Sequence, residues 1–128
     1  AKGCNNMILA ITMIGTGEAF EMGRRLGLKD QALFDVVSTA SGQSWSTTTY
    51  CPVPGPVPTS PANNDYQPGF AAALMLKDLG LSQEAAAQTA AYTPLGTHAF
   101  ELYKQFCEDG NSDVDFSGII KMMQAAKK

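Results

Sequence analysis

Charged residues are scarce in this chain of 128 residues, and positive charge is not in excess. Only 16% of the residues are Asp, Glu, Lys or Arg, and 9 basic against 12 acidic residues give a net charge of −3. Proteins that bind nucleic acid usually gather Lys and Arg on one face. We therefore expect no nucleic-acid partner. The low charge leaves surface for contact with another domain or a second copy.

Histidine and cysteine are too few and too scattered to indicate a metal site. The chain has one histidine, His98, and three cysteines, Cys4, Cys51 and Cys107, with no CxxC pair. Zinc sites usually take closely spaced pairs of these ligands. We expect no metal. The odd number and wide spacing of the cysteines indicate a reducing compartment.

Long hydrophobic runs are also missing. The longest apolar run, Met7 to Gly17, ends at Glu18, short of the roughly 20 residues that cross a bilayer. It also lacks the leader and cleavage pattern of a signal peptide. We expect no membrane contact, and the length matches one domain. Because a helix is already under way at the first candidate site, we expect a piece of a longer protein.

The first helix is expected from about Asn5 to Leu26, a segment without proline. At 1.5 Å per residue this helix is roughly 33 Å long and spans a small domain. Its several glycines lower helix propensity but let another helix approach closely. The pattern predicts a central, buried helix, ended by Gly27 in the left-handed conformation.

Further helices are expected along most of the chain. Asp30 should cap a helix of about ten residues, and Ser44 a short turn with Trp45 and Tyr50. Later helices are expected over residues 70–79, where Gly80 breaks the helix, over 83–92, from Pro94 until Gly110, and from Asp113 or Asp115 onward. Lys127 and Lys128 suit the C-terminal end of the last helix, because positive charge is favourable there. No strand is predicted. The fold class is all-α, a single domain of about six helices.

Six of the seven prolines fall between Cys51 and Gly69. Proline lacks a backbone N–H and breaks regular elements, so the segment is predicted to run extended over the surface. A loop of this length within a compact domain usually has a functional or interfacial role. A linker between domains is the alternative, which we disfavour because neither flank looks able to fold alone.

Two lysines stand out by their spacing. Lys2 and Asn6 are four residues apart and would share one face of the first helix. Lys77 follows Phe70 by seven residues, or two helical turns, while Asp78 would point about 100° away from Lys77. From spacing alone, each lysine is either part of a site or a solvated surface residue, and Lys77-Asp78 is either functional or an exposed pair.

Two other features are assigned no function. His98 has Glu101 as its only carboxylate within helical reach and is predicted to be a partly buried histidine. The segment Gly15-Thr16-Gly17 resembles half of a dinucleotide-binding fingerprint. It lies within a helical pattern instead of after a strand, so it is not expected to bind phosphate.

Several segments together resemble one enzyme family. These are AKGCNNM at residues 1–7, SG at 41–42, WS at 45–46, Tyr50, PVPG at 52–55, NN at 63–64, GF at 69–70 and LKDLGL at 76–81. In this order, and over essentially the whole chain, they resemble the β-hydroxyacid dehydrogenases, best of all the 3-hydroxyisobutyrate dehydrogenase branch.

The resemblance implies a fold like the C-terminal domain of 6-phosphogluconate dehydrogenase. Residues 1–128 would be the all-α catalytic and dimerisation domain of an NAD-dependent enzyme, whose N-terminal Rossmann domain lies outside this chain. It further implies a small hydroxyacid substrate and a homodimer or tetramer. The location would be the cytoplasm in a bacterium or the mitochondrial matrix in a eukaryote.

The resemblance also implies a role for each candidate residue. Lys2 would be the catalytic acid and base, Asn6 would bind substrate, Lys77 and Phe70 would lie at the cofactor, and Asp78 would support them. The reaction would oxidise 3-hydroxyisobutyrate to methylmalonate semialdehyde in valine catabolism. The alternatives are reduction of tartronate semialdehyde or a related β-hydroxyacid reaction, and a non-catalytic dimerisation module.

Overall fold

The structure is a computed structural model that describes residues 1–126. These residues form six α-helices and, among them, no β-strand. The helices are α1 (Lys2–Arg25), α2 (Asp30–Val37), α3 (Trp45–Thr48), α4 (Ala72–Thr89), α5 (Pro94–Phe106) and α6 (Ile120–Ala125). The prediction of an all-α fold of about six helices is confirmed. Lys127 and Lys128, predicted to suit the last C-terminus, lie outside the described residues.

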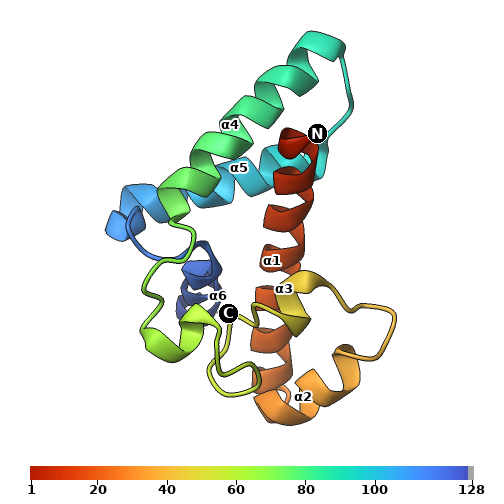
Figure 1. Cartoon of the computed structure of the whole chain (residues 1–128), viewed down its shortest axis with the longest axis vertical. Coiled ribbons are helices and arrows are strands. Elements are labelled where there is room, and N and C mark those ends of the chain that lie inside the picture. Colours follow the sequence, from red (N-terminus) through yellow and green to blue (C-terminus); the bar gives the residue numbers. More distant parts are fainter. Residues whose placement is uncertain (127–128) are drawn as a thin grey trace.

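Helix α1 is the central element, and α2, α3, α4, α5 and α6 all contact it (Figure 1). Glycine brings α1 against α6, because a Cβ on Gly17 would already be in van der Waals contact, 3.5 Å from the Cβ of Ile120. This agrees with the prediction of a central helix, but α1 is buried on only part of its surface. Ile8 and Met22 are 59% and 62% exposed, since the other helices pack around only part of the circumference of α1.

The core has two parts, one toward each end of α1. The first joins α1, α4, α5 and the 3-10 helix Phe116–Ile119, and its buried residues include Met13, Met75, Leu79, Tyr103 and Phe106. The second lies farther along α1 and consists of Phe20, Cys51, Val53, Ala62, Tyr66 and Ile120. Burial of these side chains stabilises the fold by roughly 25 cal/mol per Å² of apolar surface.

The proline-rich segment supplies much of the second core, so the prediction that it runs extended over the surface was wrong. Cys51 and Val53 are buried, and a 3-10 helix forms over Pro61–Asn64. The hydroxyl of Tyr66 donates a hydrogen bond of 2.7 Å to the carbonyl of Pro52. Proline prevents a regular helix or strand but does not prevent burial, because its ring is itself apolar.

Helix α4 is one continuous helix where two were predicted, and it begins after Phe70. Gly80 does not break it, although glycine costs about 1 kcal/mol in a helix interior; the ring of Phe100 in α5 lies against this position. Only part of the surface of α4 faces the core. Met75 and Leu79 are buried, whereas Leu74 and Leu81 are more than half exposed.

The segment before α6 satisfies the backbone at the start of α4. The amides of Ala72 and Ala73 donate to the carbonyls of Val114 and Ser112, at 2.8 and 3.0 Å. The first amides of a helix have no partner within it. This pairing therefore replaces a side-chain cap and fixes where α4 starts.

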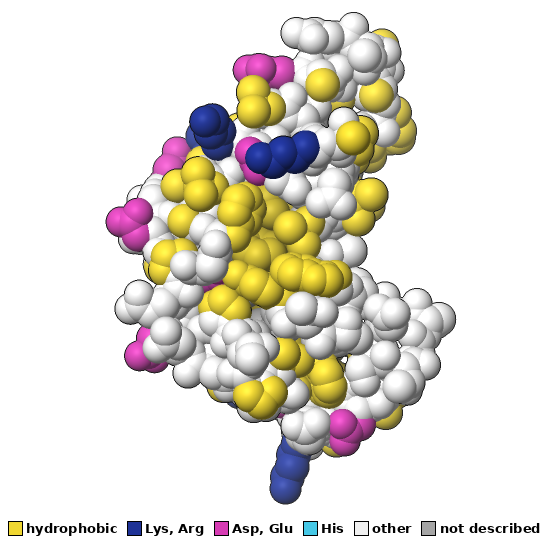
Figure 2. All heavy atoms as spheres, viewed as in Figure 1, with side chains coloured by type: hydrophobic (Ala, Val, Ile, Leu, Met, Phe, Trp, Pro, Cys, Tyr) yellow, Lys and Arg dark blue, Asp and Glu magenta, His cyan; other side chains and the backbone are white. Residues whose placement is uncertain are grey.

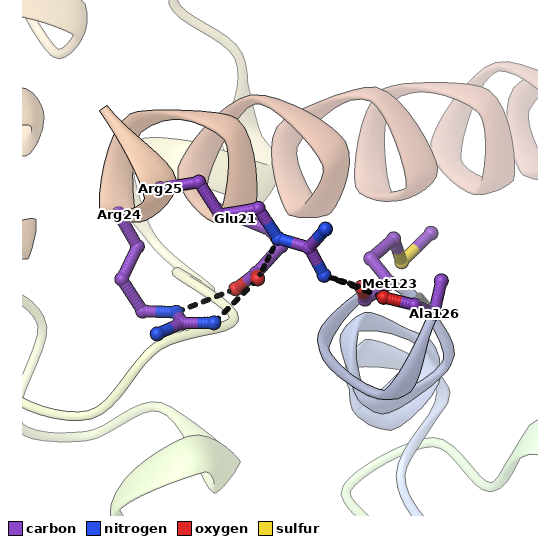
Figure 3. A network of polar contacts seen from close by, with 5 residues as sticks. All are labelled: Glu21, Arg24, Arg25, Met123 and Ala126. Atoms are coloured by element: carbon purple, nitrogen blue, oxygen red, sulfur yellow. Dashed lines mark hydrogen bonds and ion pairs between the residues drawn. The ribbon is translucent and has the colours of Figure 1, made fainter. Parts of the chain in front are cut away.

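An ionic cluster ties the end of α1 to α6 (Figure 3). The buried carboxylate of Glu21 accepts hydrogen bonds from Arg24 at 2.6 and 2.8 Å and from Arg25 at 2.7 Å. Arg25 also donates to the carbonyls of Met123 and Ala126, at 3.2 and 2.7 Å. The hydrogen bonds from Arg24, and then the one from Arg25, lower the pKa of Glu21 to about 2.

Other boundaries agree with the sequence. Ser44 precedes α3, Thr93-Pro94 starts α5, and Gly27 and Gly110 adopt left-handed conformations with φ of 92° and 95°. Asp30 begins α2 instead of capping it. Within residues 1–126, no helix is both long and apolar enough to cross a bilayer.

Candidate functional site

Two side chains from distant parts of the chain meet between α1 and α4. The side-chain amide of Asn6 donates a hydrogen bond of 2.6 Å from Nδ2 to Oδ2 of Asp78. Asn6 is only 8% exposed, and its Oδ1 accepts from the amide of Asn5 at 3.2 Å. An Asn amide carries two N–H groups. The carboxylate fixes the orientation of the amide, and this hydrogen bond uses one of the two N–H groups of Asn6.

Asn6 also lines a concavity of about 330 Å³. Its other lining residues come from α1, α3 and the segments before α4 and α6: Leu9, Trp45, Tyr50, Gly69, Phe70 and Phe116. Figure 2 shows hydrophobic side chains gathered between α1 and the start of α4, with charged side chains along the upper border of this surface. A largely apolar hollow with a single oriented amide suits a small molecule that has one polar end.

Four aromatic rings pack against one another in series along this concavity. The rings of Trp45 and Tyr50 are stacked, with centroids 4.9 Å apart and planes 21° from parallel. Tyr50 packs on Phe116 at 5.3 Å, and Phe116 meets Phe70 edge-on at 5.6 Å. Offset and edge-on pairs are favoured arrangements of aromatic rings. We call this series the aromatic wall: Trp45, Tyr50, Phe116 and Phe70.

A fully buried carboxylate, Asp115, lies behind the aromatic wall. The hydroxyl of Tyr50 donates to its Oδ1 at 2.7 Å. Burial, and then this hydrogen bond, raise the pKa of Tyr50 well above its usual range. Tyr50 therefore keeps its proton at neutral pH and is not suited to act as a base.

The predicted site residues are only partly brought together. Asn6, Asp78 and Phe70 lie at or beside the concavity. Lys2 begins α1, one turn before Asn6, and Lys77 lies on α4 next to Asp78; both lysines are exposed. The prediction that Phe70 and Lys77 share a helical face was wrong, because Phe70 precedes the helix. The catalytic and cofactor roles of these residues stay predictions.

Sequence reasoning missed most of the aromatic wall and the carboxylate behind it. Trp45 and Tyr50 are expected only in a short turn, Asp115 only as a possible start of the last helix, and Phe116 is assigned no role in a site. The one available signal was that Trp45 and Tyr50 belong to the segments shared with the resembling family. His98, predicted to be partly buried, is exposed. Among residues 1–126, no three His, Cys, Asp or Glu side chains are grouped to hold a metal ion.

Comparison with known proteins identifies the family. Residues 1–123 match the family described as "NAD-binding of NADP-dependent 3-hydroxyisobutyrate dehydrogenase". The chain belongs to this 3-hydroxyisobutyrate dehydrogenase family. The mitochondrial 3-hydroxyisobutyrate dehydrogenases of Homo sapiens and Mus musculus are 46% and 45% identical to it over 124 residues, which are 97% of this chain and 37% of each relative.

Solved structures agree with this family assignment. A 3-hydroxyisobutyrate dehydrogenase of Mycobacterium tuberculosis, solved with L-serine, is 54% identical and superimposes with a TM-score of 0.95, covering 98% of this chain and 43% of that one. A Salmonella typhimurium 3-hydroxyisobutyrate dehydrogenase is 23% identical with a TM-score of 0.77, over 94% of this chain and 40% of that one, and supports the fold alone. The chain thus spans about two fifths of the length of the relatives it matches.

Proposed function

We propose that residues 1–128 are the C-terminal, all-α domain of an enzyme that oxidises 3-hydroxyisobutyrate to methylmalonate semialdehyde with NAD, in valine catabolism. The family assignment supports an oxidoreductase that uses a nicotinamide cofactor. The short span of this chain relative to its relatives supports a further domain, which we expect to be an N-terminal Rossmann domain that binds most of the cofactor.

One observation carries this proposal at the level of residues. The two segments that resemble the family most specifically, one at the start of α1 and one in α4, meet through the Asn6–Asp78 hydrogen bond. They are 72 residues apart in the chain and need not have met. Their meeting beside a 330 Å³ concavity is what a shared site requires.

In this reaction Lys2 would act as the general base. Its neutral amine takes the proton of the substrate hydroxyl while the carbon that bears the hydroxyl loses a hydride, so that the C–O single bond becomes C=O. In the reverse direction the ammonium returns the proton to the aldehyde oxygen. The cofactor, when bound, supplies the hydride acceptor.

Asn6 would bind the polar end of the substrate through its remaining N–H. Asp78 already occupies the other N–H at 2.6 Å and fixes which way the amide faces. The aromatic wall would then contact the carbon chain of the acid. L-Serine, present in the structure of the mycobacterial relative, is a 3-hydroxy acid, which supports this class of substrate.

Lys77 would contact the cofactor from this domain. Its ammonium is exposed on α4, and lysine pairs readily with phosphate oxygens. These properties fit a dinucleotide at the edge of the site. The enzyme would work as a homodimer or tetramer, in the cytoplasm of a bacterium or the mitochondrial matrix of a eukaryote.

The test uses the full-length protein that contains this chain. Production of NADH from NAD and 3-hydroxyisobutyrate is followed at 340 nm. In the comparison assays NADP replaces NAD, L-serine replaces 3-hydroxyisobutyrate, or the reduction of tartronate semialdehyde is measured. Lys2→Ala should lower kcat by on the order of 10²–10⁴-fold, the usual contribution of general acid–base catalysis. Lys104→Ala removes an exposed lysine of α5 and should leave kcat unchanged.

Two results would overturn the proposal. One is a full-length protein that shows no activity with any of these hydroxyacids, and the other is a Lys2→Ala variant with near-normal kcat. The chain of residues 1–128 alone should produce no NADH, because half of the site is missing. Measurable turnover by it would contradict the assignment to a single domain of a larger enzyme.

A further inference from the structure

The buried carboxylate of Asp115 collects five hydrogen bonds. Three reach Oδ1, from the hydroxyl of Tyr50 at 2.7 Å and from the amides of Gly69 and Phe70 at 2.9 and 3.0 Å. Two reach Oδ2, from the amide and hydroxyl of Ser117 at 3.0 and 2.5 Å. Hydrogen bonds to an ionised acceptor are stronger than neutral ones, so this group holds its donors firmly.

The two oxygens of this carboxylate have different tasks. Ser117 lies two residues further on, and its bonds to Oδ2 cap the 3-10 helix that precedes α6. Every donor to Oδ1, in contrast, belongs to a residue that lines the concavity. These donors come from the residue Tyr50, just after α3, and from the segment before α4. Oδ1 therefore joins two separate parts of the chain at one point behind the aromatic wall.

Gly69 gives independent support for a precise arrangement here. A Cβ at this position would lie 2.7 Å from the hydroxyl oxygen of Tyr50 and 3.9 Å from Oδ1 of Asp115. A separation under 3.0 Å forces a shift of the hydroxyl. A side chain at this position would therefore displace the Tyr50 hydroxyl from the place where it donates to the carboxylate.

We propose that Asp115 is a positioning residue that sets the distance between the aromatic wall and Asn6. Through Oδ1 it holds the Tyr50 ring, and with it the stacked Trp45, together with the backbone that carries Phe70. Asn6, on α1, lines the same concavity. The distance between Asn6 and the aromatic wall then decides how closely the aromatic wall contacts the hydrocarbon part of a small 3-hydroxy acid, and this inference rests on the proposed function.

This role predicts a change in KM without a matching change in kcat. The aromatic wall contacts the carbon chain of the substrate, which is equally present in the ground state and the transition state. The proton is transferred elsewhere, at Lys2. A purely structural role would instead lower the fraction of folded protein and so the apparent kcat, while KM stayed constant.

Trp45 provides a readout that needs no activity. It is the one tryptophan of this chain and stacks on Tyr50, so its near-UV circular dichroism reports the aromatic wall. Asp115→Asn removes the charge and should strongly weaken this band in folded chain of residues 1–128, as should Gly69→Ala. Asp113→Asn, the same change at an exposed position two residues earlier, should leave the band intact.

Kinetics of the full-length protein complete the test. Asp115→Asn should raise the KM for the hydroxyacid about tenfold with kcat within about twofold, the loss expected when charged hydrogen bonds become neutral. Tyr50→Phe removes one of the bonds to Oδ1 and should raise KM about threefold, against no change for Tyr92→Phe, whose ring is 91% exposed. Ser117→Ala acts on Oδ2 and should lower the melting temperature while KM stays constant.

The results separate this inference from the proposed function. If the unmodified full-length protein lacks activity, the proposed function fails, and the Trp45 band still decides the positioning role. If Asp115→Asn does not fold, Tyr50→Phe and Gly69→Ala decide it. The inference is overturned if these folded variants keep the unmodified Trp45 band, or if their KM stays constant while kcat falls.

Discussion

The hydrogen bond between Asn6 and Asp78 can be tested as a direct link between α1 and α4. We predict that Asn6→Ala and Asp78→Ala each destabilise the chain, and that the double variant loses less than the sum of the two. Either single substitution already removes the hydrogen bond completely, so the second substitution has no bond left to remove. A double-mutant cycle isolates this shared part.

The size of the coupling follows from the geometry. A hydrogen bond to a charged group contributes about 1.5–3 kcal/mol. Asn6 is buried but Asp78 is only partly so, and solvent screening reduces the value. We therefore expect a coupling free energy of about 1 kcal/mol, or about 4 °C in melting temperature for a chain of this size.

Urea unfolding followed by far-UV circular dichroism measures the four free energies of this cycle. A matched control exists in α2, where the side chain of Gln31 donates to the carboxylate of Asp35 at 2.9 Å. Both residues are exposed, so a helical pair of this kind should couple by only about 0.2–0.5 kcal/mol. Equal coupling at the two pairs, or none at Asn6–Asp78, would refute the reasoning and remove the main support for the site.

Three further predictions concern charge, backbone and cofactor. Because the folded state lowers the pKa of Glu21 to about 2, its contribution to stability is complete above about pH 4.5 and is lost as pH falls from about 4.5 to about 2; acid unfolding of Glu21→Gln should lack this dependence. Gly15→Ala should raise the melting temperature, by about 0.5–1 kcal/mol in stability, because its Cβ would enter open space, whereas Gly96→Ala should lower it because its Cβ would lie 2.6 Å from Met7 Sδ. In the full-length protein, Lys77→Met should raise the KM for NAD more than that for the hydroxyacid, and an equal rise in both would argue against a cofactor contact.

Local rules in the sequence determined the helical class and several boundaries. Absence of proline allowed α1, and Thr93-Pro94 started α5 where expected. These signals depend on the backbone of a few neighbouring residues, so they act before any tertiary contact forms. The resemblance of ordered segments across the chain likewise pointed to the right family.

Tertiary structure decided which helices continue and which faces are buried. Gly80 looked like a helix end, yet α4 passes through it, with Met75 and Leu79 packed in the core just before it and the ring of Phe100 in α5 against it. Intrinsic propensity is a weak preference that packing of this kind overrides. The same competition buried Cys51 and Val53 within a segment whose prolines suggested an exposed loop.

The candidate site shows the same division. The sequence by itself identified Asn6, Phe70 and Asp78 as candidates and placed Lys2 one turn from Asn6. Only the tertiary structure joined Asn6 to Asp78 and set Asp115 behind the aromatic wall, because these partners are separated by 45 to 72 residues. A hydrogen bond over such a separation follows from how helices pack around α1, and no spacing within one helix can encode it.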